Sequence, residues 1–377
     1  MHWQRFWFLK LSALFAMLVL ASSMARANPM LLVDMQTNEV LFARDAGLPW
    51  HPASLTKLTT ALLVFRAIDA GRISLDTPVI ISRRAAKMPP SRSGLPVDTA
   101  LTMRDALNLL IVKSANDIAI AIAETVSGSV ENFVKEMNLL AQEMDLNASY
   151  FVNPNGLNNI RQVTSARDLA IVSLAIVRHY PQYKPIFATS IVRLNGKNLR
   201  TYNELLTKFA GTTGMKTGFV CAAGMNLVAT VTRNGRQLMA VILGASSERE
   251  RAEMAAKMIT EALAGKYRAT GKQLANIENR PDLAPTNMRP LICGAKENSY
   301  LAERAAAFPF GLEGQKSFLD DNVAPLSYNA SILGRFRNVP TPRPRPASAP
   351  IRQQPANIAG LIIPMPRPRP AIVEATH

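Results

Sequence analysis

Three short motifs contain the residues that could do chemistry: Ser54-Leu55-Thr56-Lys57, Ser114-Ala115-Asn116 and Lys216-Thr217-Gly218. Residues three apart on a helix share one face, so the amine of Lys57 can reach the hydroxyl of Ser54. A serine is a weak nucleophile until a base takes its proton, and a lysine must be neutral to act as that base. Burial lowers the pKa of a lysine, and a second nearby cation such as Lys216 lowers it further. The first motif therefore predicts a serine nucleophile with a lysine base.

The other two motifs supply groups that could handle a peptide. The Ser114 hydroxyl could pass a proton to a leaving amine, while the Asn116 amide could hold a peptide group. Lys216 and Thr217 offer a charge and a hydroxyl to a carboxylate, and Gly218 would let a substrate approach a strand edge. Taken singly, each motif also has a structural explanation as a helix cap or a basic edge strand. Only the order and spacing of all three favour catalysis.

Other common catalytic arrangements find no support. The histidines are His2, His51, His179 and His377, and no His-x-x-x-His or Cys-x-x-Cys spacing indicates zinc. A Ser-His-Asp triad would have to use His51 or His179, and neither lies in a recognisable setting. We therefore expect no metal and no cofactor.

The first 27 residues have the features of a secretory signal peptide. Arg5 and Lys10 precede an apolar run over 11–21, and Ala25-Arg26-Ala27 is a typical cleavage site before Asn28. The alternative is an uncleaved membrane anchor. Either way we expect an exported protein in the periplasm, free or associated with the inner membrane.

The chain is basic, with a formal net charge of +16. Loss of the signal, which has three basic residues and no acidic residue, would leave +13. Export argues against nucleic acid as a partner, and the charge suits an anionic envelope surface.

Two cysteines, Cys221 and Cys293, are present. In an oxidising compartment they could form a disulfide. The alternative is two separate buried thiols, and the sequence leaves both open.

Strand patterns lie towards both ends of the first 265 residues, and helix patterns lie between them. Apolar runs at 30–34 and 40–43 predict one hairpin, and runs at 225–232 and 237–243 around Asn234-Gly235 predict another. Apolar residues recur at helical spacing over 55–68, 103–112, 116–126, 131–144, 166–178 and 249–264. The predicted class is α+β, with one antiparallel sheet built from both chain ends, flanked by helices and joined to a helical lobe.

The chain changes character after residue 265. We divide it into four parts: a signal at 1–27, a folded domain over 28–265, an unassigned region over 266–330 and a tail over 331–377. The tail is rich in Pro and Arg, and proline fixes φ and removes backbone donors, so we expect disorder with polyproline II stretches. It would be either inert or an electrostatic tether to anionic cell-wall polymer or to a partner. Truncation after 330 should leave activity on a soluble peptide unchanged.

Longer segments around the motifs resemble one family. His51–Leu58, Asn153–Leu157, Thr164–Leu169 and Gly214–Phe219 are similar to segments of the D-alanyl-D-alanine carboxypeptidases. These are the low-molecular-weight penicillin-binding proteins of serine peptidase family S11. The resemblance covers about residues 28–265 and implies the serine β-lactamase/DD-transpeptidase fold.

The resemblance implies a role for each catalytic group. Ser54 would form the acyl ester, Lys57 would accept its proton, and Ser114 would relay a proton. The backbone N–H groups of Ser54 and Phe219 would form the oxyanion hole.

It also implies which groups bind the substrate. Asn116 would orient a peptide group, and Lys216 with Thr217 would hold the terminal carboxylate. Arg251, or alternatively Arg249, would help to hold that carboxylate. The substrates would be peptidoglycan stem peptides, and β-lactams would be covalent inhibitors.

Three alternatives remain beside removal of a terminal D-alanine. A class A β-lactamase needs a glutamate to drive water onto the acyl-enzyme, and none lies between Met144 and Arg167. A DD-endopeptidase acting on cross-linked stems would carry the same motifs. A non-catalytic envelope-binding protein is disfavoured by the intact Ser54 and Lys57. The sequence also lacks two common family features, a clearly β-rich second domain and a C-terminal amphipathic membrane helix.

Overall fold

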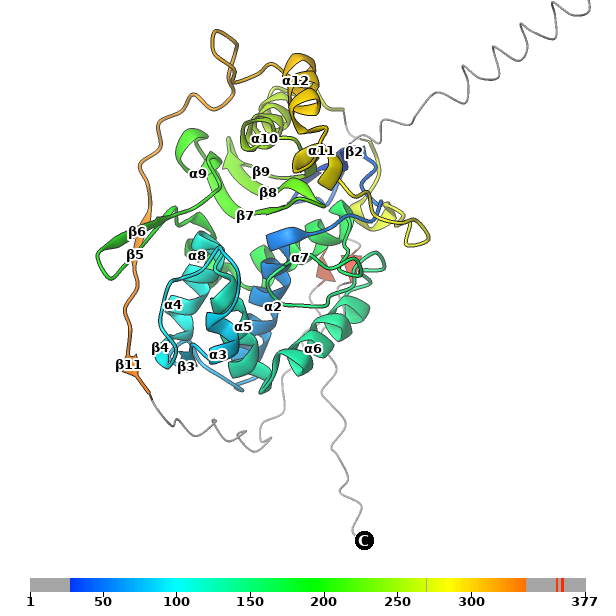
Figure 1. Cartoon of the computed structure of the whole chain (residues 1–377). Helices are drawn as coiled ribbons and strands as arrows, with labels where there is room; N and C mark the ends of the chain where they lie inside the picture. Colours follow the sequence, from blue (N-terminus) through cyan, green and yellow to red (C-terminus); the bar gives the residue numbers. More distant parts are fainter. Residues whose placement is uncertain (1–27, 269, 337–356, 359–360, 363–377) are drawn as a thin grey trace, which may run out of the picture.

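The computed structural model describes residues 28–268 and 270–336, together with the short strands β12 (Asn357–Ile358) and β13 (Leu361–Ile362) (Figure 1). The predicted signal and most of the predicted tail lie outside these residues. Among the described helices, none has the length and apolar character of a membrane span.

A five-stranded antiparallel sheet forms the centre of the fold, in the order β2-β1-β9-β8-β7. The strands are β1 (Met30–Asp34), β2 (Val40–Arg44), β7 (Thr212–Val220), β8 (Gly224–Arg233) and β9 (Arg236–Ala245). Because β1 pairs with β9, the two ends of the domain meet in one sheet, as predicted. The predicted β8–β9 turn has φ angles of 53° and 74° at Asn234 and Gly235, as a two-residue hairpin requires.

Both faces of the sheet are buried, because successive residues of a strand point to opposite sides. Leu31 belongs to an apolar cluster shared with α2 (Thr56–Asp69) and α7 (Ala166–His179). Leu32 packs in the opposite cluster with α10 (Glu248–Leu263). Figure 1 shows α10 on one side of the sheet and α2 with α7 on the other.

The helices that the apolar periodicity predicts are present. The 3₁₀ turn η1 (Ala53–Leu55) leads into α2, and α4 (Met103–Asn108) continues as a π-helical turn, η2 (Leu109–Lys113). The next helices are α5 (Asn116–Ser127) and α6 (Val130–Glu143). Ser165 caps α7 by accepting the N–H of Asp168.

Short elements complete the lobe: β3 (Pro78–Ile80), α3 (Arg83–Ala86), β4 (Thr99–Thr102), η3 (Pro181–Tyr183), α8 (Lys184–Ala188), β5 (Ile191–Leu194), β6 (Lys197–Arg200) and α9 (Leu205–Lys208). β3 pairs with β4, and β5 pairs with β6, both antiparallel. The β5–β6 hairpin was not predicted, although its turn residues, Asn195 and Gly196, have positive φ angles of 49° and 74°, close to those of the β8–β9 turn.

The region 266–330 packs on α10. Its elements are η4 (Leu274–Asn276), α11 (Arg289–Ile292), α12 (Glu297–Ala307) and β10 (Ser327–Asn329). The buried carboxylate of Glu250 accepts from Arg304 Nε at 2.9 Å, and that of Glu253 accepts from the Phe318 N–H at 2.8 Å. A buried charge that loses its partner is strongly destabilising, so α10 depends on this region.

Cys221 and Cys293 form a disulfide with their Cα atoms 5.7 Å apart. Of the two alternatives that the sequence left open, pairing is the one found. The bond joins the turn after β7 to the end of α11, and β7 carries the third motif. It therefore ties the region 266–330 to that strand.

Residues 319–336 form an extended segment, here called the strap, that runs from the sheet along the helical lobe (Figure 1). Its β10 pairs in parallel with β5, and β11 (Gly334–Arg335) pairs with β4. The expectation of disorder without sheet beyond residue 331 is therefore wrong for β11, and also for β12 and β13, which pair with each other. No proline lies between 326 and 336, so amides such as that of Leu333, which donates to the Ala100 carbonyl, remain available.

Because residues 333–336 bond to the β4 region, we now place the end of the folded chain at residue 336 and not at 330. We expect removal of 337–377 to leave thermal unfolding unchanged, because the strap and its pairings remain. Truncation after Gly265 should prevent cooperative folding, since it removes the buried Leu274, Met288 and Ile292 from the core together with the partners of Glu250 and Glu253. Circular dichroism melts of the two truncated chains test this. A cooperative melt of the shorter chain would contradict it.

Candidate active site

A tight turn at the start of α2 presents Ser54. Ala53 has φ of +49°, an uncommon angle for a residue with a side chain, and such strain clusters at functional sites. The Asn226 side chain on β8 donates to the carbonyls of His51 and Pro52 at 2.9 and 3.2 Å. These bonds fix the turn against the sheet and leave Ser54 partly exposed.

The Lys57 amine is fully buried and has three partners. It lies 3.0 Å from Ser54 Oγ, 2.8 Å from Asn116 Oδ1 and 2.6 Å from the Asn155 carbonyl oxygen. The two asparagine oxygens only accept hydrogen bonds. In a neutral amine they take both N–H groups, and the lone pair then faces the Ser54 hydroxyl, which donates to it. The arrangement suits removal of the serine proton.

The surroundings of Lys57 favour this neutral form. Burial holds its pKa well below the usual value, the charge of Lys216 lowers it further, and Asp117 acts in the opposite direction. The Asp117 carboxylate is itself engaged, since it accepts from the N–H and the hydroxyl of Ser93 at 2.9 and 2.6 Å.

Lys216 on β7 and Arg251 on α10 lie near each other in the site. Lys216 Nζ donates to the Thr217 carbonyl at 2.9 Å, and burial, then the charge of Arg251, lowers the pKa of Lys216 to about 7. Arg251 Nη2 donates to the Tyr202 carbonyl at 2.9 Å, while its buried Nε has no partner among the described residues. Two neighbouring cations with donors to spare are suited to a carboxylate.

Arg249, the alternative to Arg251, lies elsewhere. Its guanidinium donates to the carbonyls of Phe308, at 3.0 Å, and Phe310. The structure therefore brings Arg251, and not Arg249, into the electrostatic range of Lys216.

Ser114 and Asn116 follow the η2 turn. Ser114 has φ of +60°, which redirects the chain so that α5 begins at Asn116. The Asn116 backbone N–H donates to the Ser91 carbonyl at 2.8 Å and its Nδ2 donates to the Pro89 carbonyl at 3.1 Å. Asn116 thus holds the Lys57 amine in place. Its substrate-orienting role and the relay by Ser114 stay predictions.

Gly218 on β7 lies against the backbone of the nucleophile. A Cβ at this position would lie 3.0 Å from both Ser54 N and Pro52 O, so the approach favours glycine. The next residue, Phe219, has a side chain 44% exposed. The N–H groups of Ser54 and Phe219 belong to these adjoining segments, which is compatible with the predicted oxyanion hole.

Asn155 and Gly156 were not predicted as site residues. The Asn155 carbonyl accepts from Lys57, and Gly156, at φ of +84°, passes so close that a Cβ would lie 1.8 Å from the Ala53 carbonyl oxygen. The Asn-Pro-Asn-Gly sequence signals a turn. No local pattern indicates which distant side chain that turn meets.

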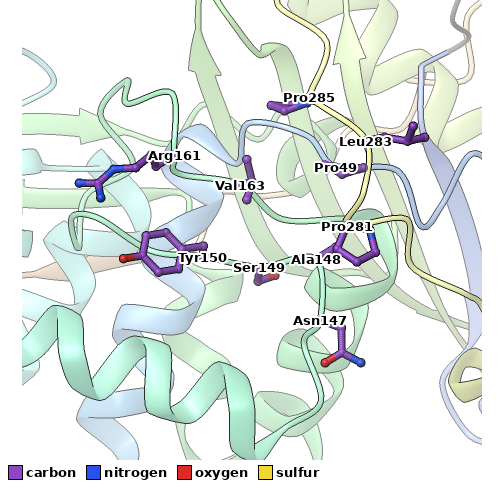
Figure 2. Close-up of a pocket in the computed structure, with 10 residues that line it drawn as sticks. All are labelled: Pro49, Asn147, Ala148, Ser149, Tyr150, Arg161, Val163, Pro281, Leu283 and Pro285. Atoms are coloured by element: carbon purple, nitrogen blue, oxygen red, sulfur yellow. The ribbon is translucent and has the colours of Figure 1, made fainter.

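A pocket of about 580 Å³ lies beside the loop that leads to Asn155. It is lined by Pro49, Asn147, Ala148, Ser149, Tyr150, Arg161, Val163, Pro281, Leu283 and Pro285 (Figure 2). None of the predicted site residues lines it, so it is separate from the Ser54 site.

Comparison with known proteins identifies the family. Residues 18–247 match the sequence profile described as D-alanyl-D-alanine carboxypeptidase, which is more than half of the chain. The chain belongs to the D-alanyl-D-alanine carboxypeptidase family. The family resemblance and the α+β fold expected from the sequence are confirmed.

Individual members of the family show the extent of the likeness. D-alanyl-D-alanine carboxypeptidase DacD of Escherichia coli is 36% identical over 240 residues, which are 62% of this chain and 62% of that protein. The crystal structure of penicillin binding protein 6B from Escherichia coli matches at 35% identity with a TM-score of 0.59, covering 62% of this chain and 76% of that chain. D-alanyl-D-alanine endopeptidase of Escherichia coli is 29% identical over 223 residues, 57% of this chain and 70% of that protein. The chain thus spans 62% of the length of the carboxypeptidase relative.

Proposed function

We propose that this protein is a serine-type D-Ala-D-Ala carboxypeptidase that removes the terminal D-alanine from peptidoglycan stem peptides and is inhibited by penicillin. The observation that carries the proposal is the 3.0 Å contact between the Lys57 amine and the Ser54 hydroxyl, in surroundings that keep the amine neutral. Membership of the family and the likeness to DacD support the choice of substrate.

The reaction runs through an ester on Ser54. Ser54 Oγ attacks the carbonyl carbon of the penultimate D-alanine while Lys57 takes its proton, and the N–H groups of Ser54 and Phe219 stabilise the oxyanion. The C–N bond breaks, and the Ser114 hydroxyl relays the proton held by Lys57 to the departing amine of D-alanine, which leaves Lys57 neutral again. Water then attacks the ester, Lys57 takes the proton of that water, and Ser54 recovers its hydroxyl.

Two measurements test this function. We expect Ser54→Ala to abolish covalent labelling by fluorescent penicillin, because no other described serine contacts a buried neutral amine. Ser299→Ala, which changes an exposed serine on α12, should label normally. Mass spectrometry of a pentapeptide stem incubated with the wild-type protein should show loss of one D-alanine. Labelling that persists in Ser54→Ala would contradict the assignment.

A DD-endopeptidase activity is the second candidate, supported by the relative of that name. The same acyl-enzyme would form, but the amine that leaves would belong to the neighbouring stem. Incubation with a cross-linked stem dimer separates the two activities, because an endopeptidase gives two monomers, whereas a carboxypeptidase leaves the cross-link whole. A non-catalytic envelope-binding protein would release neither product.

Lys216→Ala should change the pH dependence of acylation in a defined direction. Because Lys57 must be neutral, kcat/KM rises as pH rises through the depressed pKa of Lys57. Lys216 lowers that pKa, so its removal should raise the pKa and move the acid limb to higher pH. The alkaline limb that arises when Lys216 itself loses its proton, at about pH 7, should disappear.

Profiles of kcat/KM between about pH 5 and pH 9 provide the measurement. Each limb reports an apparent pKa of the Lys57–Lys216 pair and not of one lysine alone. Lys135→Ala, which removes an exposed lysine of α6, is the matched control and should keep the wild-type profile. An acid limb that stays in place in Lys216→Ala would refute the coupling between the two amines.

Export to the periplasm, through the signal at 1–27, and tethering by the tail also belong to the proposal. Residues 331–377 contain seven arginines and a single glutamate, a composition suited to anionic envelope polymer. The full chain should therefore bind isolated cell-wall material more strongly at low salt than a chain that ends at 336. Equal binding would show that the tail is inert.

A further inference from the structure

Tyr202 lies in the short link between β6 and α9, beside the proposed carboxylate site. Its backbone carbonyl accepts from Arg251 Nη2 at 2.9 Å. A terminal carboxylate held by Arg251 would therefore place the last residue of the substrate next to Tyr202. Tyr202 is 41% exposed as a residue, so a substrate can reach it.

Lys113, the last residue of η2, contacts the Tyr202 side chain. Lys113 Nζ donates to the Tyr202 hydroxyl at 3.3 Å and lies 5.4 Å from the centre of the ring. A cation at this distance from an aromatic ring is attracted to it, which restricts both side chains. Lys113 directly precedes Ser114, and its carbonyl is held by the Ser91 hydroxyl at 2.9 Å. Tyr202 thus connects the Arg251 side of the site to the Ser114 side.

The strap braces the β5–β6 hairpin, which ends two residues before Tyr202. β10 adds a third strand to β5 and β6, and the Tyr328 hydroxyl of β10 donates to Asp105 Oδ1 on α4 at 2.8 Å. The link that holds Tyr202 therefore begins at a strand that is supported by its neighbours.

We propose that Tyr202 and Lys113 form a wall at the carboxylate end of the site and select stems that end at D-alanine over stems whose chain continues. The inference rests on the proposed function and refines it, because it names the residues that separate carboxypeptidase from endopeptidase activity. The last residue of a stem that ends at D-alanine has only a methyl side chain, which fits inside the wall. In a cross-linked stem the rest of the neighbouring stem is attached at this residue and collides with the ring, and a clash of this kind is how a site rejects a related substrate.

The experiment measures kcat/KM for D-alanine release from a pentapeptide and for cleavage of a cross-linked stem dimer. Tyr202→Ala removes the ring but keeps the backbone carbonyl that holds Arg251, so the ratio of the two values should shift about tenfold towards the dimer. Lys113→Ala should shift it in the same direction. Tyr202→Phe keeps the ring and should stay near the wild-type ratio. Tyr150→Ala removes a tyrosine of similar exposure, 45%, in the separate pocket of Figure 2, and should leave the ratio unchanged.

Labelling by fluorescent penicillin shows which variants have an intact Ser54 site. If Tyr202→Ala does not label, the ratio of the two kcat/KM values in Lys113→Ala is the test. A wild-type ratio in every variant that labels overturns the inference while leaving the proposed function in place. An equal shift in Tyr150→Ala also overturns it, since the effect would then not be local. If the wild-type protein releases no D-alanine, the proposed function fails, and the inference fails with it.

Discussion

Lys57→Arg should reduce acylation by penicillin and by stem peptide about 10⁴-fold or more, the loss typical of removing the base from a nucleophile–base pair. The substitution keeps the capacity to donate hydrogen bonds to Asn116 and Asn155, but it places a permanent positive charge where the Lys57 amine is neutral. It removes the one property on which the mechanism depends, because a guanidinium cannot lose its proton in a protein. The second-order rate of fluorescent penicillin labelling measures the effect.

The control for this variant is Lys135→Arg on the exposed face of α6, which should label at the wild-type rate. A folded Lys57→Arg protein with normal labelling would show that Ser54 is activated by some group other than the Lys57 amine. Circular dichroism establishes folding, since the longer side chain must fit into a fully buried position.

Gly156→Ala should be the most damaging single-methyl change near the site. The new Cβ would lie 1.8 Å from the Ala53 carbonyl oxygen and 2.9 Å from Ser54 N, both backbone atoms that cannot rotate away. The loop and the Ser54 turn must separate, which moves the Asn155 carbonyl away from Lys57. A misplacement of about 1 Å can cost about 10²-fold in rate, so we expect at least that loss in labelling.

Gly71→Ala separates the steric effect from backbone strain. Gly71 has φ of +66° and Gly156 has φ of +84°, but a Cβ at Gly71 would meet nothing within 4 Å. It should lose about 1 kcal/mol of stability through the left-handed backbone and keep its labelling rate. Similar labelling rates for the two variants would mean that the contact between Gly156 and the Ser54 turn is unimportant.

The parts of the fold that the sequence predicted are those with a local signal. The periodicity over 55–68 gave α2, and Asn234-Gly235 gave the β8–β9 turn, because each pattern is complete within a few residues. The pairing of β1 with β9 followed from apolar strands at both ends of one domain. The same turn chemistry was present at Asn195-Gly196, so the β5–β6 hairpin could have been found.

The parts that the sequence did not predict depend on contacts between distant residues. The Asn155 carbonyl meets Lys57 only because two segments 98 residues apart pack together. The strap has no periodicity of its own, since β10 and β11 are short strands added to the edges of existing pairs. The choice between a disulfide and two free thiols likewise rests on where Cys221 and Cys293 lie in space.

The late position of β9 and of the strap in the chain determines when the nascent protein can complete its sheet. Leu32 of β1 lies beside Ala240 of β9, and the Phe336 N–H donates to the Asp98 carbonyl. A nascent chain that leaves the ribosome from its N-terminus would hold β1 with one open edge until β9 emerges, and open strand edges attract other chains. We expect such a chain to need a holdase chaperone until Ala245, the last residue of β9, has left the exit tunnel, and to gain the contacts of the strap only after residue 336 has followed.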